Sequence, residues 1–520
     1  MSKVLYVPLD ERACNYSYPQ MLAAMTDDVE LLVPPLDWMG FCKQPADCEK
    51  IWEWLFANAP QCDYAILSVD TLVYGNIINS RIHQKTQETC QKLLDRFVQL
   101  KTINPNLKIH AFNLVARVAG YNGSMEDPDY WETHGWAIWR YTCLTDKKQR
   151  GHSSEAENQE LLALEKEIPA EYLEDFLRRR VVDRATNLRC VELTEDGVFD
   201  VLTIPKDDTA EYGYAAMDQK AIAEVVRQKR LMNRVIVYPG ADEVGSVLFA
   251  RVFNLIKHYT PRVYPRFSSV LGPQIIPRYE DRPIFESLKS QIFSVGGVCV
   301  ETAEDSDCMI ALNTPGTVQI ESTEQYTKDL TFSSHINMHE FLRYILYYRK
   351  RYGRPVGLAE VSVCNGCENE FMEYALISGV LHEIQSVGGW NTTENTVGLV
   401  LAETVIASYY KGYANMPKEY QAMEEMKVHA MAADWLFQSN VLHQFLLENR
   451  ERINPYALKA DYDETYAYVK NGLEAIINQK FGPSYKGARI CIGNLFFNWD
   501  MVFMINFTVR LDGLEVPNQQ

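Results

Sequence analysis

The chain has no long hydrophobic run, few cysteines and no excess of positive charge. No stretch reaches the roughly 18 uncharged apolar residues that a membrane helix needs, so we expect no membrane span. The N-terminus has one lysine and a short apolar run before Asp10, unlike a secretory signal peptide. Its 12 cysteines are scattered, which predicts thiols and not a disulfide scaffold. We therefore expect a soluble, cytoplasmic protein without a membrane partner.

The charge balance excludes another class of partner. Asp and Glu number 69 against 51 Lys and Arg, which gives a net charge of −18. Nucleic-acid binding normally requires a basic face that neutralises phosphates, so no nucleic-acid partner is expected. The 47% hydrophobic and 23% charged fractions are those of a globular protein. Its 520 residues are enough for two or three domains, and the sequence does not fix the oligomeric state, with a homo-oligomer among the options.

Several catalytic signatures are also missing. The chain contains no G-x-x-x-x-G-K-[ST] loop, no G-x-G-x-x-G after a strand, no G-x-S-x-G and no H-E-x-x-H. Cys364 and Cys367 form a C-x-x-C after a predicted strand, which is compatible with a redox pair, although two ordinary thiols are the favoured interpretation. His335 and His339 lie four residues apart without a third histidine nearby, which favours a structural role.

Short apolar runs alternate with helical patterns, which predicts an α/β fold with mainly parallel sheets and flanking helices. We expect an N-terminal α/β domain over 1–260 with a helical insertion at about 121–193. A second, smaller α/β unit is expected over 261–330, and a mostly helical region ending in two strands over 331–520. The predicted strands cover 3–8, 29–33, 64–69, 108–114, 234–238, 263–267, 297–300, 308–312 and 357–363.

Acidic residues follow several of these predicted strands. Asp10, Asp70 and the pair Asp242-Glu243 each come directly after an apolar run, and Glu360 lies within another. Ligands of α/β sheets bind at the carboxyl ends of the strands, so these carboxylates are candidates for one shared site. Each acid taken singly can instead be the N-cap of the next helix.

Other polar segments are candidates for the walls of such a site. Asp207 and Asp208 lie in a turn-like loop with two tyrosines. The loop 388–395 combines two glycines, a tryptophan and several amides before a predicted helix, whose N-terminus offers free N–H groups. A glycine turn with a Thr or Asn cap is the structural alternative for this loop.

These motifs resemble a bacterial family known as domain of unknown function 4127 over nearly the whole chain. The resemblance rests on 8–15 (PLDERACN), 68–70 with Tyr74-Gly75 and Ser80-Arg81, Asp207-Asp208 with Tyr212-Gly213, 239–245 (PGADEVG), Asn365-Gly366, and 389–392 (GWNT) with Asn395 and Gly398. The family tends to have Pro at position 13 and Asp at 360 and 368, where this chain has Ala13, Glu360 and Glu368. The resemblance implies a link with sugar uptake and degradation but no established activity.

We predict a hydrolase that cleaves a small glycoside or amino-sugar conjugate by general acid–base catalysis, without a cofactor. Asp242 or Glu243 is the preferred acid, and Asp10 or Asp70 the preferred nucleophile or base. The catalytic candidates are Asp10, Asp70, Asp208, Asp242 and Glu243. The substrate-binding candidates are Glu11, Arg12, Asn15, Arg81, Asp207, Asn365, Trp390, Asn391, Thr392 and Asn395.

Two alternatives use the same residues. In the first, Asp10, Asp70 and Asp242 hold Mg²⁺ or Mn²⁺ for metal-assisted hydrolysis of an ester, amide or phosphate. In the second, the chain is a non-enzymatic carbohydrate-binding module in which the acids only orient a ligand.

Overall fold

The computed structural model describes residues 1–328, 332, 334–413 and 415–515. Contacts within the chain define two compact units, each assembled from separate stretches of sequence. Unit 1 comprises Met1–Glu11, Glu30–Val244 and Tyr279–Asp281, and unit 2 comprises Arg12–Val29, Gly245–Arg278 and Arg282–Gln520. The boundaries near residues 260 and 330 stay a prediction. No helix in the described part of the chain is both long enough and apolar enough to cross a membrane.

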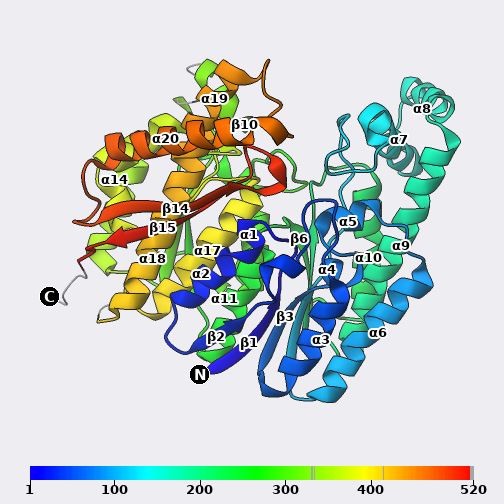
Figure 1. The fold of residues 1–520 in the computed structure, drawn as a ribbon, viewed down its shortest axis with the longest axis horizontal. Helices are drawn as coiled ribbons and strands as arrows, with labels where there is room; N and C mark the ends of the chain where they lie inside the picture. The colour runs from blue at the N-terminus through cyan, green and yellow to red at the C-terminus, as the bar shows by residue number, and fades with distance from the viewer. Residues whose placement is uncertain (329–331, 333, 414, 516–520) are drawn as a thin grey trace. The chain divides into compact units, whose positions relative to one another are not determined.

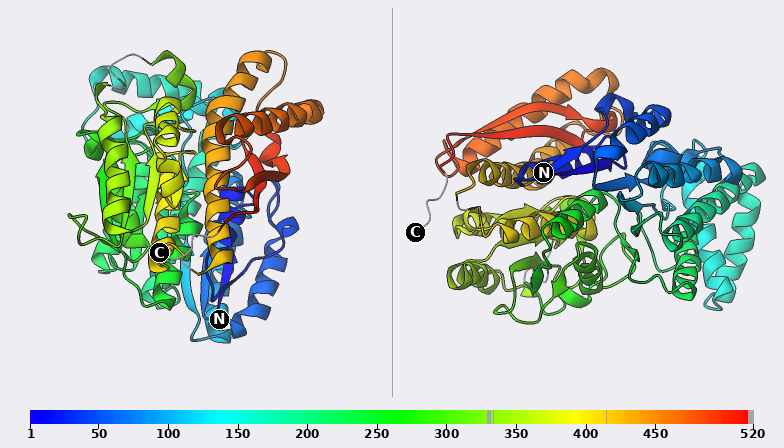
Figure 2. Two further views of the ribbon diagram at one scale, coloured as in Figure 1. Left: turned by 90° about the vertical axis from the view of Figure 1, so that its left-hand side faces the viewer. Right: turned by 90° about the horizontal axis from the view of Figure 1, so that it is seen from below.

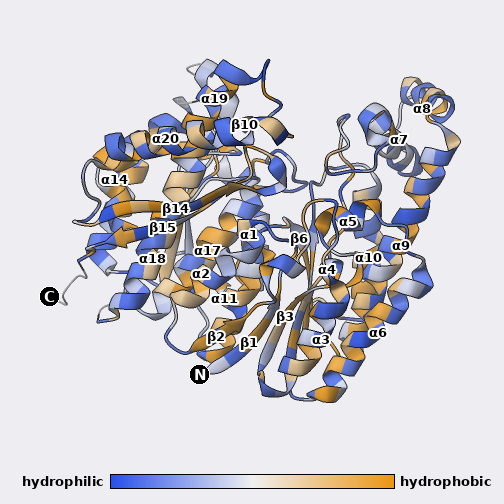
Figure 3. Ribbon diagram, viewed as in Figure 1, coloured by the Kyte–Doolittle hydropathy of each residue, from blue (hydrophilic) through white to orange (hydrophobic). Residues whose placement is uncertain are grey.

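Unit 1 is built on a sheet with strand order β2-β1-β3-β4-β5-β6, in which β1, β3, β4, β5 and β6 are parallel to their neighbours (Figure 1). Most strand residues are buried, as expected for a parallel sheet covered on both faces, and Figure 3 shows the apolar character of β1 and β3. The strands are β1 (Ser2–Val7), β2 (Val29–Leu32), β3 (Tyr64–Ser68), β4 (Lys108–Phe112), β5 (Val201–Lys206) and β6 (Val235–Pro239).

The helices of unit 1 connect these strands. The segment predicted as a helical insertion contains α7, α8 and α9, whose apolar residues form a core of their own around Trp131, Ile138 and Leu161. The helices are η1 (Leu36–Trp38), α3 (Cys48–Asn58), η2 (Ala59–Gln61), α4 (Val69–Val73), α5 (Ile77–Ile82), α6 (Gln87–Ile103), α7 (Trp131–Gln149), α8 (Glu155–Glu167), α9 (Ala170–Glu195) and α10 (Tyr214–Gln228).

Unit 2 has a parallel sheet of its own, with strand order β13-β11-β9-β7-β8. A short parallel pair, β10 with β12, and an antiparallel hairpin, β14 with β15, complete its strands. They are β7 (Arg262–Phe267), β8 (Val298–Cys299), β9 (Cys308–Asn313), β10 (Ile320–Glu321), β11 (Val356–Glu360), β12 (Val363–Cys364), β13 (Ser386–Gly388), β14 (Arg489–Phe497) and β15 (Ile505–Asp512).

Most of unit 2 is helical, and its C-terminal hairpin packs beside α18 and α20 (Figure 2). One continuous helical run from Pro417 to Asn449 contains a π-helical segment, η5, in its middle. The helices are α1 (Ala13–Tyr16), α2 (Tyr18–Ala24), α11 (Val244–Ile256), η3 (Gly272–Gln274), α12 (Ile284–Ser294), η4 (Ser322–Thr327), α14 (Met338–Tyr352), α15 (Asn369–Ile377), α16 (Val380–Glu383), α17 (Thr393–Tyr409), α18 (Pro417–Ala430), η5 (Met431–Val441), α19 (Leu442–Asn449), η6 (Lys459–Asp461), α20 (Tyr462–Phe481) and η7 (Asn498–Asp500).

The predicted α/β fold with mainly parallel sheets, flanking helices and a helical C-terminal region is confirmed. Three strands lie outside the predicted ranges, β5, β10 and β13, and the run predicted over 357–363 is divided into β11 and β12. The pattern of 371–386 predicts a single helix, and this prediction is wrong in its extent. Gly379 adopts a left-handed conformation that separates α15 from α16, and Ser386 begins β13.

Candidate functional site

Strand-end acids of unit 1 gather at one edge of its sheet. Asp10 follows β1, Asp70 follows β3, Asp207 and Asp208 follow β5, and Asp242 and Glu243 follow β6. These strands are parallel, so their carboxyl ends lie at the same edge. Glu360 ends β11 and therefore belongs to the sheet of unit 2. The acids thus belong to two sheets, and unit 1 carries every predicted catalytic residue.

Asp70 is fully enclosed and links two strand ends. Its exposure is 1%, and its carboxylate accepts hydrogen bonds from Asn113 Nδ2 at 3.1 Å and from the Leu114 N–H at 2.9 Å. Burial raises the pKa of Asp70 to about 7, against the lowering effect of these hydrogen bonds. Both carboxylate oxygens therefore anchor the segment that follows β4, which is a structural role.

Two guanidinium groups organise the acids that follow β5. Arg81, in α5, donates to Asp207 at 2.7 Å and to Glu126 at 3.0 Å. Arg117 donates to Asp208 and Glu126, each at 3.0 Å, and also contacts Asp127. Sequence reasoning found Arg81 but missed Arg117, Glu126 and Asp127, because these three lie in a loop after β4 without a recognisable motif.

Asp208 keeps access to solvent within this network. Its side chain is 33% exposed, and its backbone has a φ of +35°. Burial of the carboxyl and the neighbouring Asp207 raise the pKa of Asp208 to about 6, while Arg117 and Arg81 oppose the rise. The carboxyl is therefore mostly ionised at neutral pH.

Glu243, at the same edge of the sheet, is enclosed, in contrast to the partly exposed Asp208. It is 2% exposed, and its Oε2 accepts a hydrogen bond from the Ala241 N–H at 2.9 Å. Burial raises the pKa of Glu243 to about 8, and the charges of Asp242 and Glu280 add to the rise. Asp242 is itself 6% exposed. At neutral pH Glu243 is mostly protonated, as a general acid must be.

Gly240 makes room for the Glu243 carboxyl. Its φ is +128°, and a Cβ there would lie 2.4 Å from Glu243 Oε1. We expect Gly240→Ala to lower the free energy of unfolding by about 2–4 kcal/mol, because backbone strain and a clash combine. Gly213→Ala is the matched control, since Gly213 has a φ of +132° and a Cβ there would come no closer than 3.4 Å to a neighbouring atom. Urea unfolding of both variants measures the clash as their difference, and equal losses would contradict it.

Three further candidates, Glu11, Arg12 and Asn15, have defined partners. Glu11 Oε1 accepts from the Cys42 N–H at 2.9 Å. Arg12 and Asn15 belong to unit 2, where the Arg12 carbonyl accepts from the Asn15 N–H at 3.0 Å at the start of α1. The Arg12 guanidinium lies over the Trp499 ring, 4.5 Å from its centroid.

The loop 388–395 connects β13 to α17 within unit 2. Thr392 is the N-cap of α17, and its hydroxyl accepts from the Asn395 N–H. Asn391 has a φ of +68°, and its carbonyl accepts from the N–H of Asn365, whose φ is +57°. Asn tolerates this left-handed conformation better than most residues, which explains its use at both positions. Thr392 therefore caps α17 in the way that the structural alternative for this loop expected.

Sequence reasoning missed the acid that holds this loop. Asp434, in η5, is 5% exposed, and its Oδ2 accepts from the Gly389 N–H at 3.0 Å. Burial raises the pKa of Asp434 to about 7, while hydrogen bonds from the Gly389 and Trp390 backbone oppose the rise. Nothing in the local sequence distinguishes Asp434 from an ordinary polar residue of a helix.

Among the described residues, no group of three or more His, Cys, Asp or Glu side chains is arranged to hold a metal ion. The 12 cysteines, Cys364 and Cys367 included, are free thiols. Cys367 is buried against Gly389, where a Cβ would lie 2.3 Å from its Sγ. This packing explains the glycine at position 389.

No curated protein matches the chain. Among solved structures, the carboxyl transferase domain from Rhizobium etli pyruvate carboxylase with 3-bromopyruvate is similar at 6% identity and a TM-score of 0.20. The comparison covers 93% of this chain and 61% of that one, and its TM-score is too low to carry an argument. A family model described as "Protein of unknown function (DUF4127)" matches residues 4–508. Because this match covers nearly the whole sequence, the chain belongs to the DUF4127 family.

Proposed function

We propose that the chain is a hydrolase that cleaves a small glycoside or amino-sugar conjugate, with Glu243 as general acid and Asp208 as the ionised partner. The observation that carries the proposal is the contrast between two acids on neighbouring strands. Lys206 and Pro239 are paired at the ends of β5 and β6, and Asp208 and Glu243 follow them within a few residues. Glu243 is enclosed, whereas Asp208 is one-third exposed and paired with Arg117.

Such a pair supports acid–base hydrolysis because the two environments separate the pKa values. The pKa of Asp208 is about 6 and that of Glu243 about 8, so between these values one carboxyl is ionised and the other protonated. Glycoside cleavage requires this combination. We expect the rate to rise as the pH increases through about 6 and to fall as it passes about 8.

The first test is hydrolysis of a panel of aryl glycosides, including N-acetylamino sugars, by the full chain. Glu243→Gln is expected to lower kcat by about 10²–10⁴ for poor leaving groups and much less for dinitrophenyl leaving groups, which need no proton. Asp208→Asn is expected to slow both kinds of substrate. Activity is expected to survive EDTA, which separates this proposal from the metal-dependent alternative.

Glu403→Gln is the matched control. Glu403 lies in α17 of unit 2, is 1% exposed, and undergoes the same change of a buried acid to an amide. Its kcat is expected to equal that of the unaltered protein. If no glycoside is cleaved, the hydrolase proposal is overturned and the carbohydrate-binding alternative takes its place. If Glu243→Gln keeps both kcat and the fall of the rate above pH 8, the role of Glu243 is overturned.

A further inference from the structure

A groove in unit 2 runs between β14 of the C-terminal hairpin and α20 (Figure 1). Its empty volume is about 970 Å³ including the open mouth, and the centres of water molecules can reach about 400 Å³ of it. One wall is the face of α20 that carries Glu474, Ile477 and Asn478. The opposite wall consists of four successive residues of β14, 489–492, and the turn 482–484 closes one end.

The strand meets the groove with its edge. Successive side chains of a strand point to opposite faces, so no single face presents residues 489–492 together. What these four residues share is the outer edge of β14, on the side away from β15. In the described part of the chain β14 pairs with β15 alone, so its outer edge has no partner strand. An unpaired edge is a template for one more strand.

This edge lacks the usual protection against strand pairing. Proteins guard their edges with charges and prolines or cover them with other elements. α18 packs beside β15, where Glu425 accepts a hydrogen bond from the Leu511 N–H at 3.0 Å. β14 has no proline and a single charged residue, Arg489 at its start. Ile490 and Ile492 share a face, pack against the apolar core of unit 2 and remain half-buried.

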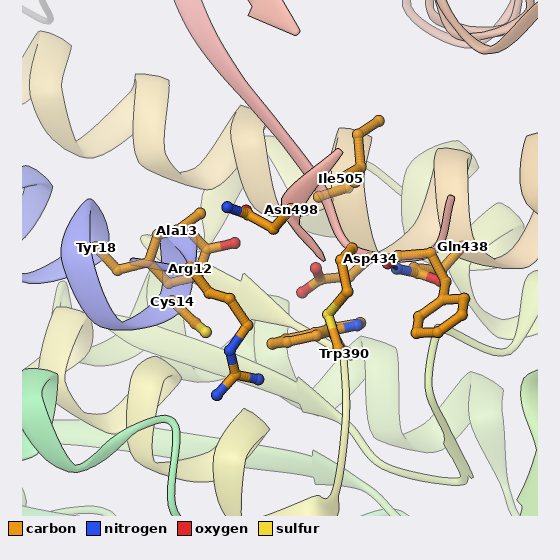
Figure 4. Close-up of a pocket in the computed structure, with 12 residues that line it drawn as sticks. Arg12, Ala13, Cys14, Tyr18, Trp390, Asp434, Gln438, Asn498 and Ile505 are labelled. Atoms are coloured by element: carbon orange, nitrogen blue, oxygen red, sulfur yellow. Dashed lines mark hydrogen bonds between the residues drawn. The ribbon is translucent and has the colours of Figure 1, made fainter. Parts of the chain in front are cut away.

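The edge is fixed in place before anything binds to it. A two-stranded hairpin on its own is marginally stable, but the far end of this one is held by its surroundings. Gln438 Nε2 donates to the Phe503 carbonyl at 2.8 Å. Asn498 and Ile505 line a pocket there with room for about one water molecule (Figure 4). A partner strand therefore meets a preformed edge.

Symmetry restricts how the edge can pair with its own copy. In an antiparallel ladder, residues whose N–H and C=O groups point outward alternate along each strand, and outward residues face one another. Two identical edges related by a two-fold axis must therefore have a residue on that axis. The regular part of β14 runs from Arg489 to Gly493, because its pairing with β15 shifts after Gly493. The central residue of this part is Cys491.

We propose that two copies of the chain associate through this edge, β14 pairing antiparallel with β14 of the second copy about Cys491. Ile490 then lies opposite Ile492 of the second copy, so apolar side chains meet on the face that adjoins the core. Arg489 lies opposite Gly493 of the second copy, which has no side chain to obstruct it. The inference goes beyond the hydrolase proposal and needs no substrate, so failure of one leaves the other standing.

Charges in the groove favour this partner. The chain reverses between α20 and β14, where Tyr485 and Ala488 exchange backbone hydrogen bonds at 2.8 and 2.9 Å. The helix and the strand therefore run in opposite directions, and Glu474, about two turns before the end of α20, lies toward Gly493. Arg489 of the second copy reaches the groove at this end. The two-fold axis forms this opposite-charge pair twice.

Sedimentation velocity of the full chain from about 1 to about 100 µM tests the association. A monomer–dimer equilibrium is expected in this range, because a strand-edge contact is small among specific interfaces. Ile492→Lys places a charge in the paired face and is expected to leave only monomer. Val509→Lys is the matched control, since Val509 is half-buried opposite Ile492 on β15, away from the edge. Its dimer is expected to persist.

Cross-linking tests the register. Cys491 is half-buried, with its thiol 3.5 Å from Asp512 Oδ2. A short bismaleimide is expected to join the two Cys491 thiols of a dimer, which gives a band of twice the mass on a denaturing gel. Cys491→Ser is expected to remove this band and to leave sedimentation unchanged. Cys48→Ser, which alters another half-buried cysteine, is expected to keep the band.

Charge reversal separates a second copy from an unrelated strand. Arg489→Glu and Glu474→Arg are each expected to raise the dissociation constant of the dimer at least about fivefold, because like charges meet twice. The double variant restores opposite charges and is expected to lie within about threefold of the unaltered protein. If Ile492→Lys does not fold, these variants and the cross-link decide. Monomer at every concentration, a band that survives Cys491→Ser, a dimer that survives Ile492→Lys, or a double variant without recovery would each overturn the proposal.

Discussion

Raising the pH from about 5.5 to about 8 is expected to lower the free energy of unfolding by several kcal/mol. Burial raises the pKa of Glu243 and Glu403 to about 8 and that of Asp70, Glu360 and Asp434 to about 7. In the unfolded chain these groups titrate near their ordinary values, about 4. Between about 4 and 8 the folded state therefore binds more protons, so stability is lost as the pH rises through this window.

Two buried groups oppose the effect, each in part of the range. Burial lowers the pKa of His429 to about 4, so the folded state binds fewer protons there between about 4 and 6.5. Burial also lowers the pKa of Lys427 to about 7, so the folded state binds fewer protons there above about 7. These two groups do not outweigh five raised carboxyls. The urea concentration at the midpoint of unfolding, measured from pH 5 to pH 8, is expected to be highest at the acid end of this range and to fall toward pH 8. A midpoint that stays constant or rises toward pH 8 would contradict the prediction.

Glu403→Gln isolates the contribution of one acid to the pH dependence of the unfolding free energy. The Glu403 carboxyl is 1% exposed in α17. Glutamine has nearly the same shape and never ionises, so we expect a gain of about 2 kcal/mol or more at pH 8 and a smaller gain of about 1 kcal/mol at pH 5.5. Glu451→Gln, an exposed acid on the same unit, is the control and should leave the profile unchanged.

Replacing Lys206 by methionine is the second change with a large expected effect. The Lys206 side chain is 0% exposed at the end of β5 and forms an ion pair with Asp281, whose side chain is 12% exposed. Its Nζ also donates to Gln219 Oε1 at 3.1 Å. Lys206→Met leaves the Asp281 carboxylate without this cation, and we expect a loss of about 3–5 kcal/mol in unfolding free energy.

The partner substitution shows whether the charge is the cause. In Lys206→Met with Asp281→Asn the uncompensated charge is gone, so most of the loss is expected to be recovered. Lys108→Met is the matched control, since Lys108 pairs with Asp200 at 3.1 Å but its side chain is 56% exposed. That exposed pair is expected to contribute less than about 1 kcal/mol. Equal losses for Lys206→Met and Lys108→Met in urea unfolding would refute the argument.

The fold class was predictable because buried parallel strands appear in sequence as short apolar runs between helices. β5 was not predicted as a strand because Pro205 and Lys206 interrupt its apolar run. In the structure Pro205 nevertheless lies in a strand that is paired on both sides. β13 has only three residues, Ser386–Gly388, too few for any periodicity. Which strand joins which sheet was not predictable either, because pairing is non-local, and Glu360 was therefore grouped with acids of another sheet.

The candidate site, too, was only partly predictable from the sequence. Glu243 was identifiable because it follows an apolar run. Asp208 was identifiable only as part of a polar, turn-like loop with two tyrosines, because the strand before it was not predicted. Arg117 and Asp434 were not, because each acts through partners far away in sequence, Asp208 and the Gly389 N–H respectively. The burial contrast between Asp208 and Glu243 also depends on packing around each residue, which no local motif encodes.

The discontinuous units have a consequence for synthesis of the chain. Residues 12–29 are made long before residue 245, yet they belong to a unit whose remaining parts begin at residue 245. At about 5–20 residues per second, Leu22 and Met25, both 0% exposed in the finished protein, wait tens of seconds for their neighbours. Unit 1 in turn lacks Asp281, the partner of Lys206, until translation has passed residue 281. The nascent chain therefore presents apolar surface that chaperones recognise, and a fragment cut at any single point would leave at least one unit incomplete.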